Sequence, residues 1–258
     1  MKKICKVAAV LMALLLAVGV LAGCQSETAG EGALDRIKAN GKITMLTNAQ
    51  FAPFEYIKDN EPAGVDVDIA QAIADEIGVE LEITDMDFDA IIDFLNAGKG
   101  DFAAAGLTVN EERKAVVDFS IEYVTSTQYV IVPKDTDTAS YDLNGKVIGV
   151  QAGTTGDLYY ASVEDYFKAG DVKRYKSAVD AVAEMKAGRV DCVIIDELPA
   201  KKLVEENPEY IAYDPGYPPE SYAIAVQKGN TELLDVINKV LQKFVDEGKI
   251  DELVVKHS

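Results

Sequence analysis

The sequence DFAAAGLTVNEERKAVVDFS, residues 101–120, contains the strand-to-helix transition that decides the fold. Its apolar run Phe102–Ala105 is typical of a strand buried on both faces, and this pattern breaks at Gly106. Asn110, which two glutamates follow, is typical of a helix start. Arg113 follows on that predicted helix. The stretch therefore predicts a strand that ends in a turn, with one guanidinium beside the free backbone groups of the turn.

Two interpretations of Arg113 follow from this position. Exposed backbone N–H groups and a planar guanidinium with five donors suit the binding of a carboxylate. Alternatively, Arg113 caps the turn or pairs with Glu111, and the stretch by itself slightly favours this structural role. Arg113 is, however, one of four arginines among 21 lysines. A bidentate carboxylate clamp is a role that lysine performs poorly.

Three short segments carry a resemblance to a known family: Ala-Gly-Leu-Thr at 105–108, Glu-Arg-Lys at 112–114 and Asp-Phe-Ser at 118–120. Together they resemble the signature of amino-acid-binding proteins of ABC importers, the solute-binding proteins of family 3. The resemblance extends from about Leu34 to the C-terminus. It implies the periplasmic-binding-protein type II fold, in which two doubly wound α/β lobes are joined by a two-strand hinge.

The N-terminus has the pattern of an export signal. A basic start, MKKICK, precedes the apolar run Val7–Ala22, which is too short and wrongly flanked for a spanning helix. The run ends in Leu-Ala-Gly-Cys at 21–24, which resembles the bacterial lipobox. We therefore expect a signal peptide over residues 1–23, a diacylglycerol anchor on Cys24 and a flexible tether over 24–32. The alternative is an ordinary export signal with an unmodified Cys24.

Composition excludes several classes of function. Removal of residues 1–23 takes away three lysines and no acid, which leaves 22 basic and 44 acidic residues and a net charge of −22. Such a chain does not bind nucleic acid or an anionic membrane surface by charge. The one histidine, His257, is next to last, and there is no cysteine cluster, so histidine-based triads and ordinary zinc sites are excluded. We expect no cofactor, and a monomer.

An internal repeat predicts two lobes. Residues 89–106 and 177–196 share a helix, a glycine stop and a buried strand at a spacing of ninety residues, so that Gly106 corresponds to Asp196. Alternating strands and helices indicate a mostly parallel, doubly wound sheet in each copy. Ligands of such sheets bind beyond the carboxyl ends of the strands. We therefore expect Gly106 and Asp196 on opposite walls of one cleft.

Two extended segments predict the links between the lobes. Residues 123–132 lack helical periodicity, and a Tyr-Pro-Pro sequence at 217–219 breaks the chain before another strand-like run. In the resembling family two such crossovers form the hinge. The expected division is lobe 1 at 33–122 and 223–258, lobe 2 at 128–217, and the hinge at 123–127 and 218–222.

The resemblance also implies a ligand site that both lobes share. Phe51 and Phe88 are its aromatic walls, and Asn48 lies where relatives often carry an acid or a polar group. The Gly-Thr-Thr-Gly turn at 153–156 precedes a predicted helix, so its N–H groups favour an anion. Asp196 either caps the helix that follows it or holds the ammonium group of the ligand, and the match with the family favours the second. The predicted ligand-binding residues are Asn48, Phe51, Phe88, Ala105, Gly106, Thr108, Arg113, Gln151, Gly153, Thr154, Thr155 and Asp196.

These groups predict a zwitterion site. Arg113 and two N-terminal turns would hold an α-carboxylate, while Asp196, the Gly106 carbonyl and the Thr108 hydroxyl would hold an α-ammonium. We therefore expect an exported, membrane-anchored receptor that binds a free, preferably polar amino acid and delivers it to an ABC permease. One alternative is a dehydratase of the cyclohexadienyl dehydratase type on the same fold, for which no dedicated acid/base group is evident. The other is a receptor specific for basic amino acids, which the net charge faintly favours.

Overall fold

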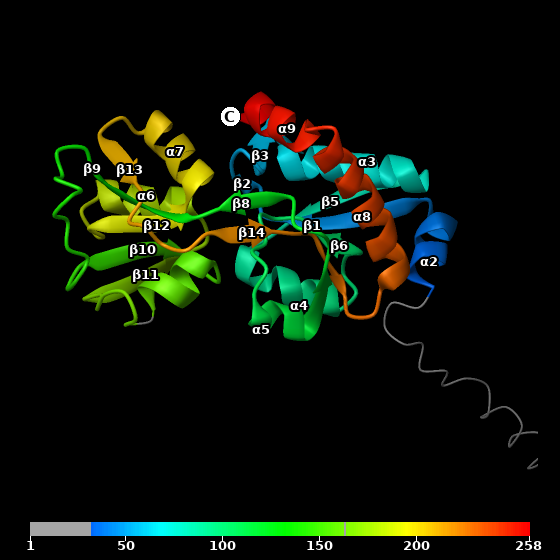
Figure 1. Ribbon diagram of the computed structural model, residues 1–258, viewed down its shortest axis with the longest axis horizontal. Coiled ribbons are helices and arrows are strands. Elements are labelled where there is room, and N and C mark those ends of the chain that lie inside the picture. Colours follow the sequence, from blue (N-terminus) through cyan, green and yellow to red (C-terminus); the bar gives the residue numbers. More distant parts are fainter. Residues whose placement is uncertain (1–31, 163) are drawn as a thin grey trace, which may run out of the picture.

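The computed structural model describes residues 32–162 and 164–258 (Figure 1). The predicted signal peptide, Cys24 and nearly all of the tether lie outside the described residues. Two five-stranded sheets form separate lobes, with helices packed on them, and two short strands run between the lobes (Figure 1). Within the described part of the chain, no helix is long and apolar enough to cross a membrane.

The first lobe is built on a sheet with the strand order β5-β1-β6-β15-β7. Its strands are β1 (Lys42–Thr47), β5 (Glu80–Asp85), β6 (Phe102–Ala103), β7 (Val117–Phe119) and β15 (Ala225–Gln227). Its helices are α2 (Ala33–Asn40), α3 (Val65–Ile77), the 3₁₀ turn η1 (Phe88–Ala90), α4 (Ile91–Asn96), α5 (Glu111–Val116), α8 (Thr231–Asp246) and α9 (Lys249–His257). A small antiparallel sheet adds β2 (Gln50–Phe51), β3 (Glu55–Lys58) and β4 (Glu61–Ala63). β1 is parallel to both of its neighbours, whereas β15 is antiparallel to both of its own.

The second lobe repeats this arrangement with the order β11-β10-β12-β9-β13. Its strands are β9 (Gln128–Pro133), β10 (Val147–Gln151), β11 (Asp171–Tyr175), β12 (Cys192–Asp196) and β13 (Tyr210–Tyr213). Its helices are α6 (Ala178–Lys186), α7 (Glu197–Glu206) and one irregular π-helical turn, η2 (Gly156–Ala161). Here β10 is parallel to both neighbours and β9 is antiparallel to both. The predicted fold class, two α/β lobes of one design, is confirmed, but each sheet has as many antiparallel as parallel pairings and is not mostly parallel as expected.

Both copies of the repeat occupy the same position in their lobes. β6 and β12 are the third strands of the two sheets, and each pairs with a parallel strand on one side and an antiparallel strand on the other. All five residues of β12 are buried, as its apolar run predicts. β6 is shorter than predicted, because its ladder stops after Ala103, but the residues as far as Leu107 remain buried. Gly106 and Asp196 therefore both follow buried central strands.

Two antiparallel strands, β8 (Val124–Ser126) and β14 (Glu220–Tyr222), cross between the lobes (Figure 1). They fall within the two segments that the sequence predicts as crossovers. Tyr222 also pairs with Thr108 in an isolated antiparallel bridge. This bridge ties the crossing strands to the turn that follows β6.

The amphipathic helices pack their apolar faces against the core. On α3, Ile69 and Ile73 are fully buried, with Ala70 and Ala74 beside them. Phe54 is fully buried. Tyr56, two residues later, is only partly buried, and its hydroxyl lies 3.0 Å from the ring nitrogen Nδ1 of His257.

Candidate functional site

A small cavity lies between the two lobes. The residues that line it are Phe51, Phe88, Gly106, Thr108, Arg113, Gln151, Thr154, Thr155 and Asp196. All of them belong to the set that the sequence predicts, and they come from both lobes. The cavity volume is about 10 Å³, which is roughly the space of one water molecule. The lobes are therefore nearly closed on each other.

The three other predicted residues lie directly behind this lining. Asn48 accepts a hydrogen bond from the side chain of Gln151 at 2.9 Å. The carbonyl of Gly153 accepts from Arg113 at 3.0 Å. Ala105 is buried and precedes Gly106 in the turn. The structure thus gathers the whole predicted set around one space.

Arg113 is held on α5 by bonds at both ends. Its backbone N–H donates to the Asn110 side chain at 2.8 Å, which is the predicted helix cap. The guanidinium donates from Nη1 to the carbonyl of Thr108 at 2.8 Å and lies 5.5 Å from the ring centre of Phe88. The alternative pairing with Glu111 is not seen, because Glu111 bonds to Lys114 instead.

The charge of Arg113 is buried without a carboxylate bonded to it. Only 7% of the residue is exposed, and none of its hydrogen bonds to described residues goes to an acid. Burial lowers the pKa of Arg113, while the nearby Glu220 opposes this shift. A buried guanidinium of this kind favours an anionic ligand.

The turn at Gly106 requires glycine. Its φ of +55° is in the left-handed region, and a Cβ there would lie 2.6 Å from the ring of Phe51. Phe51 in turn packs against Phe54 and Tyr222, with ring centres 6.0 and 6.4 Å apart. The aromatic wall and the turn are therefore packed as one unit.

The turn of lobe 2 differs in part from the prediction. The N–H of Gly153 donates to the carboxylate of Asp157 at 3.2 Å, so it is not directed at the cavity. Asp157 also accepts from Arg174 at 3.0 Å. The following turn, η2, is π-helical rather than the expected regular helix. Thr154 and Thr155 remain as the lining residues of this turn.

Asp196 ends β12 and is 3% exposed. It stands at the N-cap position of α7, but its side chain makes no capping bond there. Instead it accepts a hydrogen bond from the hydroxyl of Tyr222 at 2.6 Å. Burial and then the nearby Glu220 raise the pKa of Asp196 to about 7. The helix-cap interpretation of Asp196 does not hold for its side chain.

Three residues of this region were not predicted from the sequence. Gln128, opposite Asp196 in the sheet, donates to the hydroxyl of Thr155 at 3.1 Å and to the carboxylate of Glu220. Tyr222 holds Asp196, as described above. Glu220 and Tyr222 both belong to β14, and their only sequence signal is their place just after the Pro-Pro break.

Polar contacts join the lobes beside the cavity. Gln151 donates from Nε2 to Asn48 and to the carbonyl of Lys176, and the ammonium of Lys176 bonds to Asp87 at 2.8 Å. These bonds fix the orientation of the Gln151 amide. Its oxygen Oε1 is buried and has no hydrogen-bond partner among the described residues. The cavity wall therefore carries a free acceptor next to Asn48.

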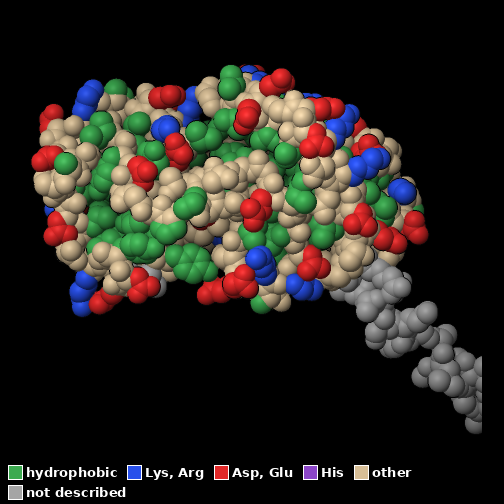
Figure 2. Space-filling model, viewed as in Figure 1, with side chains coloured by type: hydrophobic (Ala, Val, Ile, Leu, Met, Phe, Trp, Pro, Cys, Tyr) green, Lys and Arg blue, Asp and Glu red, His purple; other side chains and the backbone are tan. Residues whose placement is uncertain are grey.

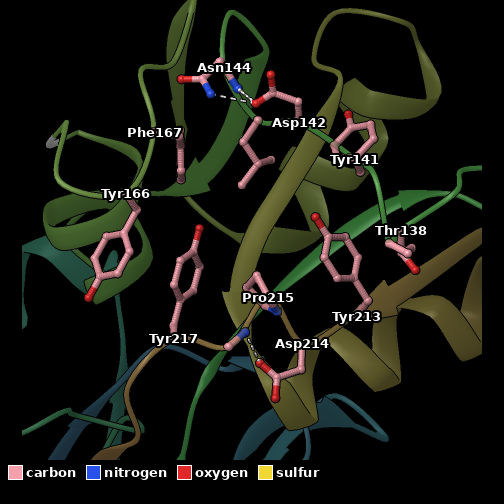
Figure 3. Close-up of a pocket in the computed structure, with 13 residues that line it drawn as sticks. Thr138, Tyr141, Asp142, Asn144, Tyr166, Phe167, Tyr213, Asp214, Pro215 and Tyr217 are labelled. Carbon is pink, nitrogen blue, oxygen red and sulfur yellow. Dashed lines mark hydrogen bonds between the residues drawn. The ribbon is translucent and has the colours of Figure 1, made fainter.

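A second, wider cavity of about 570 Å³ lies in lobe 2, away from the predicted residues (Figure 3). Aromatic side chains on its walls include Tyr141, Tyr166, Tyr213 and Tyr217. Tyr217 and Tyr166 pack with ring centres 5.0 Å apart. Its carboxylates, such as Asp142, are exposed and already bonded within their own loops. It is an open surface depression rather than an enclosed site.

The surface carries mixed charge. On the face shown in Figure 2, basic side chains are scattered among acidic ones. Within the part of the chain that the structure describes, no group of three or more His, Cys, Asp or Glu side chains could hold a metal ion.

Comparisons with known proteins agree with the geometry. The arginine-binding extracellular protein ArtP of Bacillus subtilis is 35% identical over 221 residues, which cover 83% of this chain and 85% of ArtP. The solved structure of holo ArgBP from T. maritima has 40% identity and a TM-score of 0.76 and covers 81% of this chain and 93% of that one. The amino acid ABC transporter substrate-binding protein AbpA from Streptococcus pneumoniae, bound to L-arginine, has 33% identity and a TM-score of 0.80. It covers 86% of this chain and 97% of its own.

The family match extends through both lobes. Residues 43–258 match the bacterial extracellular solute-binding proteins, family 3. This range begins within β1 and ends at the C-terminus, so it includes both sheets and every residue around the cavity. The chain therefore belongs to the bacterial extracellular solute-binding proteins, family 3.

Proposed function

We propose that this protein is an extracytoplasmic receptor that binds one free amino acid between its lobes and delivers it to an ABC importer permease, with L-arginine as the preferred ligand. One observation carries the proposal: a buried guanidinium, Arg113, and a buried carboxyl, Asp196, line the same cavity from different lobes. An α-amino acid presents the complementary pair of charges on one carbon. Neither lobe alone can complete both contacts.

The carboxylate of the ligand would lie at Arg113. The guanidinium has five N–H groups and uses Nη1 and Nη2 for protein carbonyls, so further donors remain for a carboxylate. Thr154 and Thr155 line the cavity from the other lobe, and the Thr154 hydroxyl already donates to the Gln151 carbonyl at 2.8 Å. The ammonium group would lie at Asp196, with Gly106 and Thr108 beside it. These assignments are the proposed ligand contacts.

The side chain of the ligand would point toward Gln151 and Phe51. The buried, unpartnered oxygen of Gln151 can accept a hydrogen bond from a guanidinium, and the ring of Phe51 offers an apolar face. The relatives reported above carry arginine in their names or their bound ligand. These points favour the basic-amino-acid alternative over a receptor for neutral polar amino acids.

Binding requires the lobes to separate first. An amino acid does not fit in a cavity of about 10 Å³. We propose that the lobes, residues 33–122 with 223–258 and residues 128–217, move about a hinge at 123–127 and 218–222. β8 and β14 are the strands in these segments, and they can bend without disturbing either five-stranded sheet.

The enzymatic alternative has less support. A dehydratase would need an acid or base at the reacting carbon. The ionisable groups at the cavity are Arg113 and Asp196, and the proposed zwitterion site uses both. Incubation with prephenate or arogenate, followed by an assay for the aromatic product, would detect the activity directly.

We further propose that the mature protein is a monomer held at the outer face of the membrane by a lipid on Cys24. The support is the lipobox-like sequence Leu-Ala-Gly-Cys at 21–24 after an apolar run of signal length. Membership of an extracellular family is consistent with export.

The test of the proposed ligand is direct. Protein purified and gently unfolded should release its co-purified amino acid, which mass spectrometry identifies. The refolded, ligand-free protein is then titrated by calorimetry with arginine, lysine, histidine, glutamine and cystine. Tight binding of arginine, with weaker binding of the rest, is the expected result. Preferential binding of a neutral amino acid would overturn the arginine assignment, and binding of none would overturn the receptor.

A further inference from the structure

Two fully buried carboxyl groups lie behind the Gly106 turn. Glu55 begins β3 and Asp66 is the second residue of α3, and neither is exposed at all. The strand and the helix meet tightly here, because a Cβ at Gly64 would lie 2.1 Å from the carbonyl oxygen of Phe54. The N–H of Asp66 donates to that same carbonyl at 3.0 Å. This junction places the two acids next to each other.

Asp66 has donors for both of its oxygens. Oδ1 accepts from the hydroxyl of Tyr123 at 2.6 Å, and Oδ2 accepts from the backbone N–H of Gly106 at 3.0 Å. Its position in the first turn of α3 also favours a negative charge. Asp66 is therefore the member of the pair that is suited to carry the charge.

Glu55 has no such support. When it is treated as a carboxylate, neither of its oxygens has a hydrogen-bond partner in residues 32–162 and 164–258. The ionisable groups that face it are Asp66, Tyr123, Asp196 and Asp85, all of them acids. A second buried negative charge at this position would be both unsolvated and repelled. Burial, and then Asp66, accordingly raise the pKa of Glu55 well above its usual value.

A proton on Glu55 resolves this conflict. The junction brings the two buried carboxyl groups together, so a protonated Glu55 can donate to the carboxylate of Asp66. The pair then holds one proton and one negative charge, as buried carboxyl pairs do elsewhere. Asp66 becomes the acceptor of three donors, one from Glu55, one from Tyr123 and one from Gly106.

We propose that Asp66 is a positioning residue for the ligand site and that Glu55 shares a proton with it. Asp66 fixes the peptide of Gly106, which lines the cavity, and it also holds Tyr123, which directly precedes the crossing strand β8. The pair thereby connects one wall of the cavity to the proposed hinge. This role rests on the proposed function, but the shared proton does not.

The shared proton is tested without ligand. Infrared difference spectra between wild type and Glu55→Gln should contain the C=O band of the protonated Glu55 carboxyl. The spectra are taken at about pH 8, where Asp196 is ionised and contributes no such band. The amide of the variant keeps a donor for Asp66, so the fold is retained. Glu61→Gln, which changes an exposed acid on the adjacent strand β4, is the control and should lose no such band. Absence of the band from the difference spectrum would overturn the shared proton.

The positioning role is tested with Asp66→Asn. An asparagine offers one acceptor to the three donors and adds an N–H₂ group of its own, so we expect arginine affinity to fall at least tenfold and exchange of the Gly106 amide hydrogen to accelerate. Tyr123→Phe removes only one of the donors and should reduce arginine affinity less than Asp66→Asn does. If Asp66→Asn does not fold, Tyr123→Phe is used to test the positioning role.

The two proposals fail in different ways. If the wild-type protein binds no amino acid, but exchange of the Gly106 amide hydrogen is faster in Asp66→Asn than in wild type, only the proposed function is contradicted. The positioning role is overturned if arginine binds with equal affinity to wild type, Asp66→Asn and Tyr123→Phe, and if exchange of the Gly106 amide hydrogen is unchanged in both variants.

Discussion

Arg113 and Gly153 connect the lobes directly, since Nη2 of the guanidinium donates to the Gly153 carbonyl at 3.0 Å. The donor belongs to a helix of lobe 1 and the acceptor to the turn after β10 of lobe 2. The same guanidinium donates to the carbonyl of Thr108 at 2.8 Å. One side chain therefore holds the two turns together and still has free donors for a ligand.

Replacement of Arg113 should weaken ligand binding strongly. Arg113→Ala removes the buried partner of the carboxylate, and we expect a loss of about 2–5 kcal/mol in calorimetry. Arg113→Lys keeps the charge but cannot contact Thr108, Gly153 and a carboxylate together, so it should recover only part of the loss. Lys114→Ala, on the exposed side of the same helix, is the control and should bind as wild type. Unchanged affinity in Arg113→Ala would remove Arg113 from the site.

Ligand affinity should fall as the pH drops below about 7. Asp196, whose pKa is raised to about 7, carries a proton below that pH in the free protein. Binding of an ammonium group requires the ionised form, so each bound ligand then releases one proton. The dissociation constant should rise by up to about tenfold per pH unit below 7, and little above it. Calorimetry in two buffers of different ionisation enthalpy counts the released proton.

Glu220→Gln tests the origin of this pH dependence. Burial is the main cause of the raised pKa of Asp196, and the nearby charge of Glu220 is the second. Neutralisation of Glu220 should therefore lower the pKa of Asp196. The onset of weak binding should then move to lower pH. A profile that keeps its midpoint near 7 in this variant would assign the effect to burial alone.

Gly106→Ala should be more costly than an ordinary glycine substitution. The residue has a φ of +55°, and the new Cβ would lie 2.6 Å from the Phe51 ring. Gly41 also has a positive φ, +70°, but no atom lies within 4 Å of its Cβ position. Backbone strain should therefore lower the free energy of unfolding of Gly41→Ala by about 1–2 kcal/mol. Overpacking should lower that of Gly106→Ala by about 1–3 kcal/mol more. Urea unfolding measures both, and equal losses would show that the ring moves aside freely.

The ligand should favour the closed arrangement of the lobes. Half of the proposed contacts lie on each lobe, so ligand binds the closed form better and shifts the population toward it. Small-angle scattering should give a smaller radius of gyration with arginine than without it. Asp196→Ala, which lacks the ammonium partner, should show little change at the same arginine concentration. Superimposable wild-type curves under saturating conditions would mean that the free protein is already closed.

Cys24→Ala should abolish lipidation. The wild-type protein should incorporate a labelled fatty acid and fractionate with membranes, because its cysteine follows Leu-Ala-Gly at the end of the apolar run. The variant should remain unlabelled and be processed poorly. An unlabelled wild-type protein would contradict the anchor.

The features that the sequence predicts are those encoded within short segments. The apolar runs before Gly106 and Asp196, together with the repeat, indicate two strand ends, and both residues line the cavity. The cap at Asn110 likewise depends on neighbours only three residues apart. Such patterns need no knowledge of how the lobes are arranged.

The features that escaped prediction depend on contacts between distant segments. Tyr222 reaches Asp196 only because β14 pairs with β8, and nothing in the run after Pro219 indicates a hydroxyl donor. Glu55 follows Phe54 in an aromatic loop, where an acid is normally exposed, and its burial results from the helix packed against it. Asp157, in the π-helical turn, accepts hydrogen bonds from the preceding turn and from Arg174 on another strand.

The return of the chain from lobe 2 to the sheet of lobe 1 also determines when lobe 1 can fold. β15 begins at Ala225. Among the described residues it is the only sheet partner of β7, and it also pairs with β6 on the side away from β1. A growing chain that ends before Ala225 leaves β7 without a partner and β6 unpaired on one side. Lobe 1 therefore cannot close its sheet until nearly the whole polypeptide is available. Every strand of lobe 2 lies before Ala225, so lobe 1, whose chain begins first, completes its sheet last.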